Sequence, residues 1–568
     1  MTVLPGPFMM PIRRLRMIAF VAAFALIAAA CGEPEPLTIE EAEIELQELV
    51  DDIDWIDDPV TRRANLAPSG QADLAQTLPD IDQFPLEVRA PGGADVVVEI
   101  FASTEKSGDG TDGWIIEVAD DFNDEQVTLS DGRTAAVEIR EIASGTGYQY
   151  IAAGRDIPEG FTPSNHLWIQ MAGVHETMTP ISDQLVPNVA GIVMKDETAE
   201  ELRAKYSTLD AGTLIEAVVA GDVVMGYTDP FASSTGLNFL LTVLNDFADG
   251  DESRLTAPDV ASVLEQFQQQ VPFVALTTLQ MRESVENDNG SLDAFVMEWQ
   301  TYIQTDSLRS GFEFIPFGIR HDNPLYAVGD VSPAELETLE AFADFARRDR
   351  YRNLAEDYGF DPPEYTSDVD IPAGSSLIAA QNLWKEKKDG GRPVAAVFVA
   401  DVSGSMAGTR LFSLQRALRT ARGFISAEAS VGMVEFSDQT VLKLPIEEFD
   451  LNQQARFIAA VDDMDAAGGT AMYDGITLGL SMLLNHQATN PNAKLLLIVL
   501  TDGETNEGYT LNDVQAAIGG LRIPVYTVGF EANLDELGRL SSLVEAATIN
   551  ASEEDVEFKI SALFNAGT

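Results

Sequence analysis

The sequence predicts an α/β protein built on parallel sheets, and three observations lead to this fold class. First, apolar runs such as 394–400 and 495–500 are too short for helices and suit strands buried on both faces. Second, such runs alternate with helix-like segments along most of the chain, as in βα units. Third, hydroxyl and carboxyl residues directly follow several runs, at the strand ends where open α/β sheets bind ligands.

The length and charge of the chain narrow the classes of protein that it can represent. Its 568 residues predict two or three domains, and 45% hydrophobic residues are enough to form their cores. With 35 Lys and Arg against 92 Asp and Glu, the net charge is −57. Phosphates would be repelled, which argues against nucleic acid and anionic membrane surfaces as partners. The same charge favours solubility and association with divalent cations.

The N-terminal segment has the features of an export signal. Arg13, Arg14 and Arg16 precede the apolar run 17–30, which falls short of the roughly 20 residues needed to span a membrane. Small residues before the single cysteine resemble a bacterial lipoprotein box, although Ala28 stands where that family usually has Leu. The resemblance implies removal of residues 1–30 and lipidation of Cys31, which would anchor the protein to the outer face of the cell membrane. A plain cleaved signal with an incidental cysteine is the alternative.

Residues 31–92 are expected to form a tether with a small packing segment. An acidic stretch over 38–58 has apolar residues on one side and predicts a helix. The following residues, 59–91, are rich in Pro, Gly and polar side chains and are expected to be irregular.

Residues 93–360 alternate between strand-like and helix-like segments. Strands are predicted over 96–101, 135–142, 188–194 and 223–228, and helices over 114–122, 213–220, 237–247 and 334–359. This order resembles the type 2 periplasmic solute-binding fold. The resemblance implies two α/β lobes, a first crossing near 189–195 and a return crossing over 314–328.

Several loops of this region follow strands and open helices, where backbone N–H groups attract anions and carboxylates. The resemblance makes their residues candidate contacts for a small or anionic solute: Ser103, Thr104, Ser144, Gly145, Thr146, Ser164, Asn165, Thr228, Ser233, Ser234 and Thr235. The alternative is that they only cap helices or form turns. Glu298, within an expected helix over 295–302, is predicted to be a solvated carboxylate rather than a cleft residue.

Residues 361–391 are predicted to be a linker with one helical turn or more around 377–385, because Pro and Gly recur there. Residues 392–568 then form a further domain. Its strands are predicted over 394–400, 431–436, 440–444, 495–500 and 524–528, with 440–444 as an antiparallel edge. Its helices are predicted over 411–427, 451–464, 471–484 and 556–564.

The last domain carries the most specific pattern in the chain. Asp401, Ser403 and Ser405 follow one buried strand, Asp502 follows another, and Thr470 lies in a Gly-rich loop before a helix. Hard oxygen donors at the end of a sheet suit Mg²⁺, and Gly404 allows the tight turn between two of them. Taken alone, the first three residues equally fit a strand-to-helix turn with a serine cap.

All five residues together resemble the metal-ion-dependent adhesion site of von Willebrand factor type A domains. The resemblance implies a Rossmann-like, doubly wound parallel sheet. It also implies Ser403, Ser405 and Thr470 as direct ligands of Mg²⁺, Mn²⁺ or Ca²⁺, with Asp401 and Asp502 acting mostly through water. One coordination position would then remain for a carboxylate from a partner protein.

The sequence therefore predicts a binding protein rather than an enzyme. It has no Gly-Lys-Ser/Thr phosphate loop, no G-x-S-x-G elbow and no zinc-protease helix. We expect an envelope-anchored lipoprotein that binds a partner protein through the metal, with the membrane contacted only through the lipid. The alternative is an extracytoplasmic solute receptor for a transporter or sensor, in which the last domain is a docking module.

Overall fold

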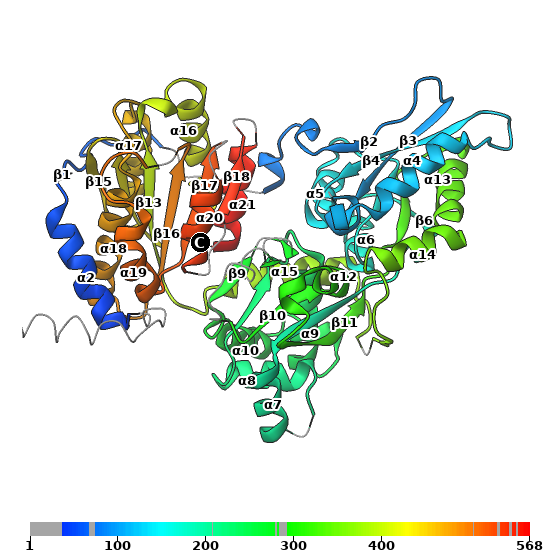
Figure 1. The fold of residues 1–568 in the computed structure, drawn as a ribbon, viewed down its shortest axis with the longest axis horizontal. Helices are drawn as coiled ribbons and strands as arrows, with labels where there is room; N and C mark the ends of the chain where they lie inside the picture. Colours follow the sequence, from blue (N-terminus) through cyan, green and yellow to red (C-terminus); the bar gives the residue numbers. More distant parts are fainter. Residues whose placement is uncertain are drawn as a thin grey trace, which may run out of the picture.

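The part of the chain that the structure describes contains three sheets covered by helices (Figure 1). The structure is a computed structural model that describes residues 37–567, except 67–73, 109, 207, 276, 279–280, 283–291, 368, 504, 531–533, 545–547 and 553–554. The predicted signal peptide and Cys31 lie outside the described residues. Among those that are described, no helix is both long and apolar enough to cross a membrane. The predicted α/β class is confirmed.

The C-terminal domain contains a seven-stranded sheet in the order β1-β15-β14-β13-β16-β17-β18. Its strands are β1 (Trp55–Asp57), β13 (Val394–Asp401), β14 (Ser430–Phe436), β15 (Thr440–Glu448), β16 (Lys494–Thr501), β17 (Val525–Phe530) and β18 (Thr548–Ala551). Its helices are α2 (Ile39–Asp52), η6 (Gly404–Met406), α16 (Thr409–Ala421), α17 (Leu451–Asp463), α18 (Met472–Thr489), α19 (Leu511–Leu521), α20 (Leu534–Ser542) and α21 (Val556–Gly567).

The central strand β13 explains why this sheet is doubly wound. It pairs in parallel with β14 on one side and β16 on the other, and all its residues are buried. Ala396 and Phe398 face a core formed with α16, α17 and α21, while Val397 and Val399 face a core formed with α2, α18 and α19. The predicted continuous apolar run is therefore a strand with a hydrophobic core on each face.

Two N-terminal elements complete this domain. The strand β1 pairs in parallel with β15, so β15 is not the edge strand that the sequence predicted. The helix α2 buries Ala42, Leu46 and Val50 in the core beside α18 and α19. Part of the predicted tether is thus integrated into the C-terminal sheet, because a strand and a helix from that segment supply its missing edge and cover.

The front region has two lobes, each with its own sheet. The first lobe has the sheet β2-β4-β3-β5-β12-β6, and the second lobe has the sheet β11-β7-β10-β8-β9. First-lobe elements are η1 (Leu74–Thr77), η2 (Ile81–Gln83), β2 (Leu86–Val88), β3 (Val96–Ala102), α3 (Thr104–Ser107), η3 (Gly110–Asp112), α4 (Trp114–Glu125), β4 (Ala135–Glu141), α5 (Ser144–Ala153), β5 (Gly160–Thr162), α6 (His166–Ala172), β6 (Met178–Ser182), β12 (Leu325–Val328), α13 (Pro333–Ala346) and α14 (Asp349–Asp357).

The second lobe contains β7 (Val189–Lys195), α7 (Asp196–Lys205), α8 (Ala211–Val219), β8 (Met225–Thr228), α9 (Ser234–Phe247), η4 (Glu252–Arg254), α10 (Pro258–Gln268), β9 (Phe273–Ala275), β10 (Ala294–Glu298), α12 (Trp299–Gln304), η5 (Asp306–Leu308) and β11 (Phe312–Arg320). The chain crosses from β6 into β7 and returns from β11 into β12, which pairs antiparallel with β5 and β6. These are the two crossings that the sequence predicted.

The predicted linker contains a longer helix than expected, α15 (Gly374–Lys387). It packs against α6 of the first lobe and against α9 and α10 of the second. The Trp384 indole N–H donates to the Tyr227 hydroxyl at 2.5 Å, and Gln381 Nε2 donates to the Pro230 carbonyl at 2.7 Å. The segment before the C-terminal domain is thus an ordered bridge across both lobes.

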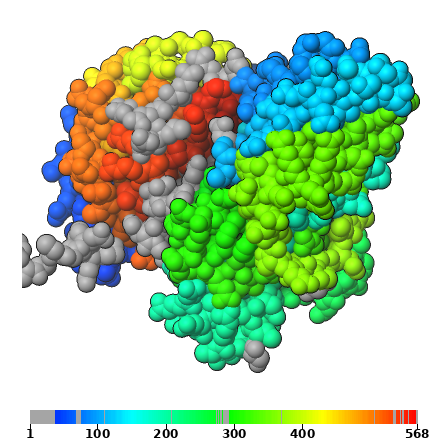
Figure 2. Space-filling view, turned by 45° about the vertical axis from the view of Figure 1, so that its right-hand side comes forward, coloured from blue at the N-terminus to red at the C-terminus, as the bar shows by residue number. Residues whose placement is uncertain are grey.

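The C-terminal domain lies directly beside the lobes, and Figure 2 shows its red α21 next to the blue N-terminal segment that contains η1. Ser552 Oγ lies 3.4 Å from Gln83 Oε1 at this contact. At the other end of the domain, Lys494 Nζ lies 3.0 Å from Asp389 Oδ1, just after α15. The first contact also has an apolar part, since Phe558 of α21 belongs to the hydrophobic core of the front region; the second is an ion pair.

Candidate functional site

The predicted metal residues lie at the carboxyl edge of the C-terminal sheet. Because β13 and β16 are parallel neighbours with Ala400 opposite Leu500, Asp401 and Asp502 emerge at the same edge. Ser403 and Ser405 follow in the turn that leads to α16, at η6. Strand pairing therefore brings two of the three predicted loops together.

Hydrogen bonds join the side chains of these two loops. The Ser403 and Ser405 hydroxyl oxygens are 3.0 Å apart, and Ser405 Oγ donates to Asp502 Oδ1 at 2.8 Å. Asp401 is fixed from below, since its Oδ1 accepts the Ser403 N–H at 2.7 Å and its Oδ2 accepts the Thr501 hydroxyl. Four of the five predicted residues thus form one connected oxygen cluster.

The loop of Thr470 lies against both of the others. Gly404 N–H donates to the Gly468 carbonyl at 3.1 Å, which ties this loop to the turn after β13. Thr470 N–H donates to Asn506 Oδ1 at 2.9 Å, which ties it to the loop after β16. Thr470 is buried with 4% of its surface exposed, whereas Ser405 is exposed. The site is therefore closed beneath and open on the side of Ser405.

The electrostatics of this cluster favour a positive charge. Burial raises the pKa of Asp401, and the nearby Asp502 raises it further. Arg410, in the first turn of α16, donates from Nη1 to Asp502 Oδ2 at 2.7 Å. The sequence analysis gave Arg410 no role in this site. Arg410 closely follows the turn that contains Ser403 and Ser405, and this proximity in the sequence could have indicated the contact.

The residues present fit a divalent cation. Two carboxylates and three hydroxyls are hard oxygen donors of the kind that Mg²⁺ prefers. The described residues contain no group of three or more His, Cys, Asp or Glu that could hold a metal, so hydroxyls are needed to complete a donor set here. A bound cation would supply a positive centre for an external carboxylate; Asp401, Ser403, Ser405, Thr470 and Asp502 are the residues that would hold it.

The candidate solute residues of the front region are buried between the lobes. Ser103, Ser144, Thr146, Ser164, Asn165, Thr228, Ser233, Ser234 and Thr235 are each less than 9% exposed, Gly145 is buried and Thr104 is half-buried. Several bond across the lobes: Gly145 N–H donates to the Ala232 carbonyl at 3.1 Å, and Asn165 Nδ2 donates to the Ser234 carbonyl at 3.2 Å. Asn165 and Ser233 also cap α6 and α9.

The prediction for Glu298 is wrong. It is the last residue of the strand β10, paired with β7, and its side chain is buried rather than solvated. His321 Nδ1 lies 2.8 Å from its Oε1, and Asn188 Nδ2 donates to its Oε2 at 2.8 Å. The apolar run before it continues as a strand, so the residue that ends the run lies between the lobes instead of on a helix surface.

Two charged residues of α3, which sequence reasoning missed, lie in the same place. Lys106 Nζ donates to the Thr162 carbonyl at 2.8 Å and to Asn323 Oδ1 at 3.0 Å, while Ser164 Oγ donates to Glu105 Oε2 at 3.1 Å. We call Glu105, Lys106, Glu298 and His321 the interlobe cluster. The only sequence signal for α3 was that its charges directly follow Ser103 and Thr104.

Burial shifts the pKa values of the whole interlobe cluster toward the neutral forms. It raises the pKa of Glu105 to about 7 and that of Glu298 to about 7. It lowers the pKa of Lys106 to about 8 and that of His321 to about 4. The charged forms of these groups are stabilised only by one another and by neighbouring amides and hydroxyls.

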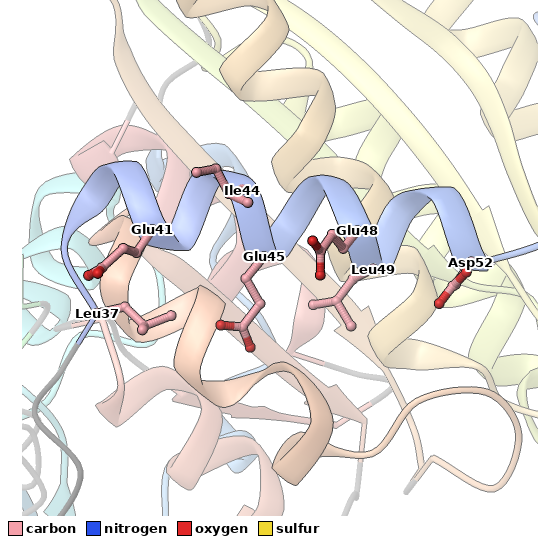
Figure 3. A pocket seen from close by; sticks show the side chains of 7 residues that line it. All are labelled: Leu37, Glu41, Ile44, Glu45, Glu48, Leu49 and Asp52. Atoms are coloured by element: carbon pink, nitrogen blue, oxygen red, sulfur yellow. The ribbon is translucent and has the colours of Figure 1, made fainter.

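A surface groove of about 500 Å³ lies along α2, apart from both clusters (Figure 3). Its lining is mainly acidic with an apolar part: Leu37, Glu41, Ile44, Glu45, Glu48, Leu49 and Asp52. None of the predicted site residues belongs to it. It is the outer, polar side of an amphipathic helix whose other side is buried in the domain core.

Residues 396–564 match the profile of the von Willebrand factor type A domain family. The C-terminal region is therefore a von Willebrand factor type A domain, as its motif predicted. Curated relatives include inter-alpha-trypsin inhibitor heavy chain H1 of Mesocricetus auratus, 32% identical over 171 residues, which are 28% of this chain and 18% of that protein. Heavy chain H3 of Bos taurus is 31% identical over 155 residues, or 25% of this chain and 17% of that protein. The chain thus spans less than a fifth of the relatives it matches.

Solved structures resemble the two regions separately. A von Willebrand factor type A protein from Catenulispora acidiphila covers 31% of this chain and 42% of its own, with a TM-score of 0.28 and 21% identity. The periplasmic binding protein AfuA from Actinobacillus pleuropneumoniae covers 52% of this chain and 99% of its own, with a TM-score of 0.38 and 11% identity. These likenesses concern the fold alone, and the two-lobed α/β topology of the front region is given by the strand pairings described above.

Proposed function

We propose that this chain is an envelope-anchored binding protein whose type A domain captures a partner protein through a divalent cation. The observation that carries the proposal is the oxygen cluster at the carboxyl edge of the sheet, with Ser405 exposed and the carboxylates buried. Asp401, Ser403, Ser405, Thr470 and Asp502 hold the cation in this proposal. Mg²⁺ suits the small, hydroxyl-rich donor set, and Mn²⁺ or Ca²⁺ are the other candidates.

The chain's own residues perform three tasks in this proposal. Thr501 and the Ser403 N–H orient the Asp401 carboxylate. The two serine hydroxyls are uncharged, so they leave most of the cation's charge for an incoming ligand. The exposed Ser405 defines the side from which a partner approaches. No basic or nucleophilic group is needed, so the activity is binding rather than catalysis.

Anchoring completes the proposal and rests on sequence alone. Lipidation at Cys31 would hold the protein at the outer face of the cell membrane, while its net charge of −57 keeps the body of the molecule away from anionic lipids. The partner would therefore be another protein of the envelope or its surroundings that offers an Asp or Glu side chain.

Metal binding is tested first, by calorimetric titration of the full chain with Mg²⁺. Ser403→Ala and Asp502→Asn should abolish binding, while Ser426→Ala, in the loop after α16, should leave it unchanged. Partner capture is then measured from envelope extract with Mg²⁺ and with EDTA, using the wild type and Asp401→Ala. Capture that persists in EDTA and in the Asp401 variant contradicts the proposal.

A second candidate function is that of an extracytoplasmic receptor for a small polar solute. It is favoured by the interlobe cluster, which lies where β10 ends and where both crossing segments run. A solute that binds there should stabilise the full chain saturably in a thermal screen of polar metabolites. Glu298→Gln should remove that stabilisation, whereas Ser403→Ala should not.

A further inference from the structure

Arg410 brings a permanent positive charge into the proposed metal site. Its guanidinium donates to Asp502 Oδ2 at 2.7 Å, while Ser405 Oγ occupies the other oxygen, Oδ1, at 2.8 Å. The Asp502 side chain is 0% exposed and that of Arg410 is 32% exposed. Arginine stays protonated at all physiological pH values, so this charge cannot be removed by titration.

The other arginines of α16 are used differently. Arg416 pairs with Glu557 of α21, and Arg419 pairs with Asp462 of α17. These two pairs join helices on the surface of the domain. Among these three pairs, only that of Arg410 involves a predicted metal residue. The Arg410 side chain therefore changes the charge of the site itself.

The charge balance of the site explains what Arg410 does there. Two carboxylates, Asp401 and Asp502, are buried in one hydrogen-bonded cluster, so their negative charges repel one another across a short distance. A nearby cation relieves this repulsion, and both a guanidinium and a divalent metal ion do so. The two cations repel one another and share the same carboxylate, so each weakens the binding of the other.

We propose that Arg410 is a tethered counter-cation that competes with the divalent metal ion for Asp502 and thereby sets the metal affinity of the site. This inference rests on the proposed function, since it concerns the regulation of the same site. Arg410 keeps the domain stable at low metal concentration and restricts metal binding to conditions in which divalent cations are abundant, as outside the cell.

The test compares four versions of the full chain: wild type, Arg410→Gln, Arg410→Lys and Arg419→Gln. Mg²⁺ affinity is measured by calorimetry, and the unfolding temperature is measured with EDTA and with saturating Mg²⁺. Arg419→Gln is the matched control, because it removes an arginine of the same helix that pairs outside the site. Arg410→Lys keeps the positive charge and loses only the planar guanidinium, which can donate two parallel hydrogen bonds to a carboxylate.

Arg410→Gln should bind Mg²⁺ about tenfold more tightly, because a like charge within a few ångströms is worth at least that factor. It should also unfold at a lower temperature in EDTA and gain more from Mg²⁺ than the wild type does. Arg410→Lys should remain near the wild type, and Arg419→Gln should keep the wild-type affinity. Binding by Arg410→Gln alone, with none by the wild type, also supports the proposal.

Two results would overturn the inference, and they differ in what else they affect. If the wild type binds Mg²⁺ and Arg410→Gln binds it equally or more weakly, Arg410 only supports the fold and the proposed function survives. If neither protein binds Mg²⁺, the inference and the proposed metal site are both wrong. A variant that fails to fold is recognised by circular dichroism, and Arg410→Met, which also removes the charge but keeps a long side chain, then takes its place: tighter Mg²⁺ binding than the wild type supports the inference, and equal or weaker binding overturns it.

Discussion

The type A site and the interlobe cluster are both built from polar side chains at strand ends, but they differ in what holds them together. The type A site draws on loops of one sheet, whose spacing is fixed by the pairing of β13 with β16. The interlobe cluster draws on two sheets that are joined by two crossings. Its geometry therefore depends on how closely the lobes approach, and not only on strand register.

This difference changes how the polar groups are satisfied. In the type A site Ser405 remains exposed, and the cluster has a side from which a ligand can approach. Between the lobes, Glu298, Lys106 and His321 are buried and are bonded to groups of the protein itself. A site at the edge of one sheet can stay exposed to solvent without loss of structure, whereas a site between two lobes can be filled by side chains of the lobes themselves.

The largest effect is expected from removing the buried cation of the interlobe cluster. Lys106→Met removes the donor to Asn323 Oδ1 and one of the two donors to the Thr162 carbonyl, and it leaves buried carboxylates without a counter-charge. Breaking a buried charge pair costs about 3–5 kcal/mol. Urea unfolding of the full chain should show this loss in the transition of the front region alone.

The matched control for Lys106 is Lys205→Met. Lys205 pairs with Asp222 on the surface, with 54% of its side chain exposed. Exposed pairs contribute at most about 1 kcal/mol, so this variant should unfold almost as the wild type does. An equally small effect for Lys106→Met would mean that water reaches the cluster, and the contrast with the type A site would then disappear.

The contact between the lobes is tested by Gly145→Val. A Cβ at Gly145 would lie 2.1 Å from the Phe231 carbonyl oxygen across the lobes, closer than any real contact. The lobes should separate, with a loss of about 1–3 kcal/mol from overpacking. Small-angle scattering should report a larger radius of gyration, while Mg²⁺ binding by the type A domain stays unchanged. Gly92→Val, where a Cβ meets nothing within 4 Å, is the control.

The sequence predicted which residues meet at the carboxyl edge of the type A sheet, because that information is local. Each residue follows a recognisable strand or loop, and parallel pairing places the ends of neighbouring strands together. It failed for Glu298, because the apolar run of four residues before it, 294–297, fits a strand or a buried helix equally well. It missed Glu105 and Lys106, because charged residues are rarely buried. The pairing of β1 with β15 was also missed, since register between distant segments leaves no local pattern.

The pH dependence of stability should be steeper in the front region, which buries three acids with pKa values raised to about 7, Glu105, Glu298 and Asp229, than in the type A domain, where burial raises the pKa of Glu435 to about 7. Glu105 and Glu298 have pKa values raised to about 7, so the folded front region binds protons that the unfolded chain releases above about pH 4.5. These groups stabilise the fold at low pH, and their contribution is lost as the pH rises toward 7. The lowered pKa of His321 acts in the opposite direction below pH 6.5 but involves one group against the three acids.

The front region should therefore lose stability between pH 5 and pH 7, by about 1.4 kcal/mol per pH unit for each net proton released. The measurement is urea unfolding at several pH values, with Glu298→Gln as the comparison. The variant should flatten the slope of the front transition and leave that of the type A domain unchanged. A slope equal to that of the wild type would show that Glu298 ionises normally in the folded protein.

The smallest effect is expected from removing a helix cap. The same experiment shows whether the segment before β1 stabilises the type A domain or the front region. Thr38 and Glu41 form a capping box at the start of α2, and Ser332 and Glu335 form the same box at the start of α13. Loss of such a cap costs about 1 kcal/mol. Because α2 packs on α18 and α19, Thr38→Ala should lower only the transition of the type A domain, whereas Ser332→Ala should lower only that of the front region. If Thr38→Ala leaves the type A transition in place, α2 rests on the domain without stabilising it, and the segment acts as the tether that its composition first indicated.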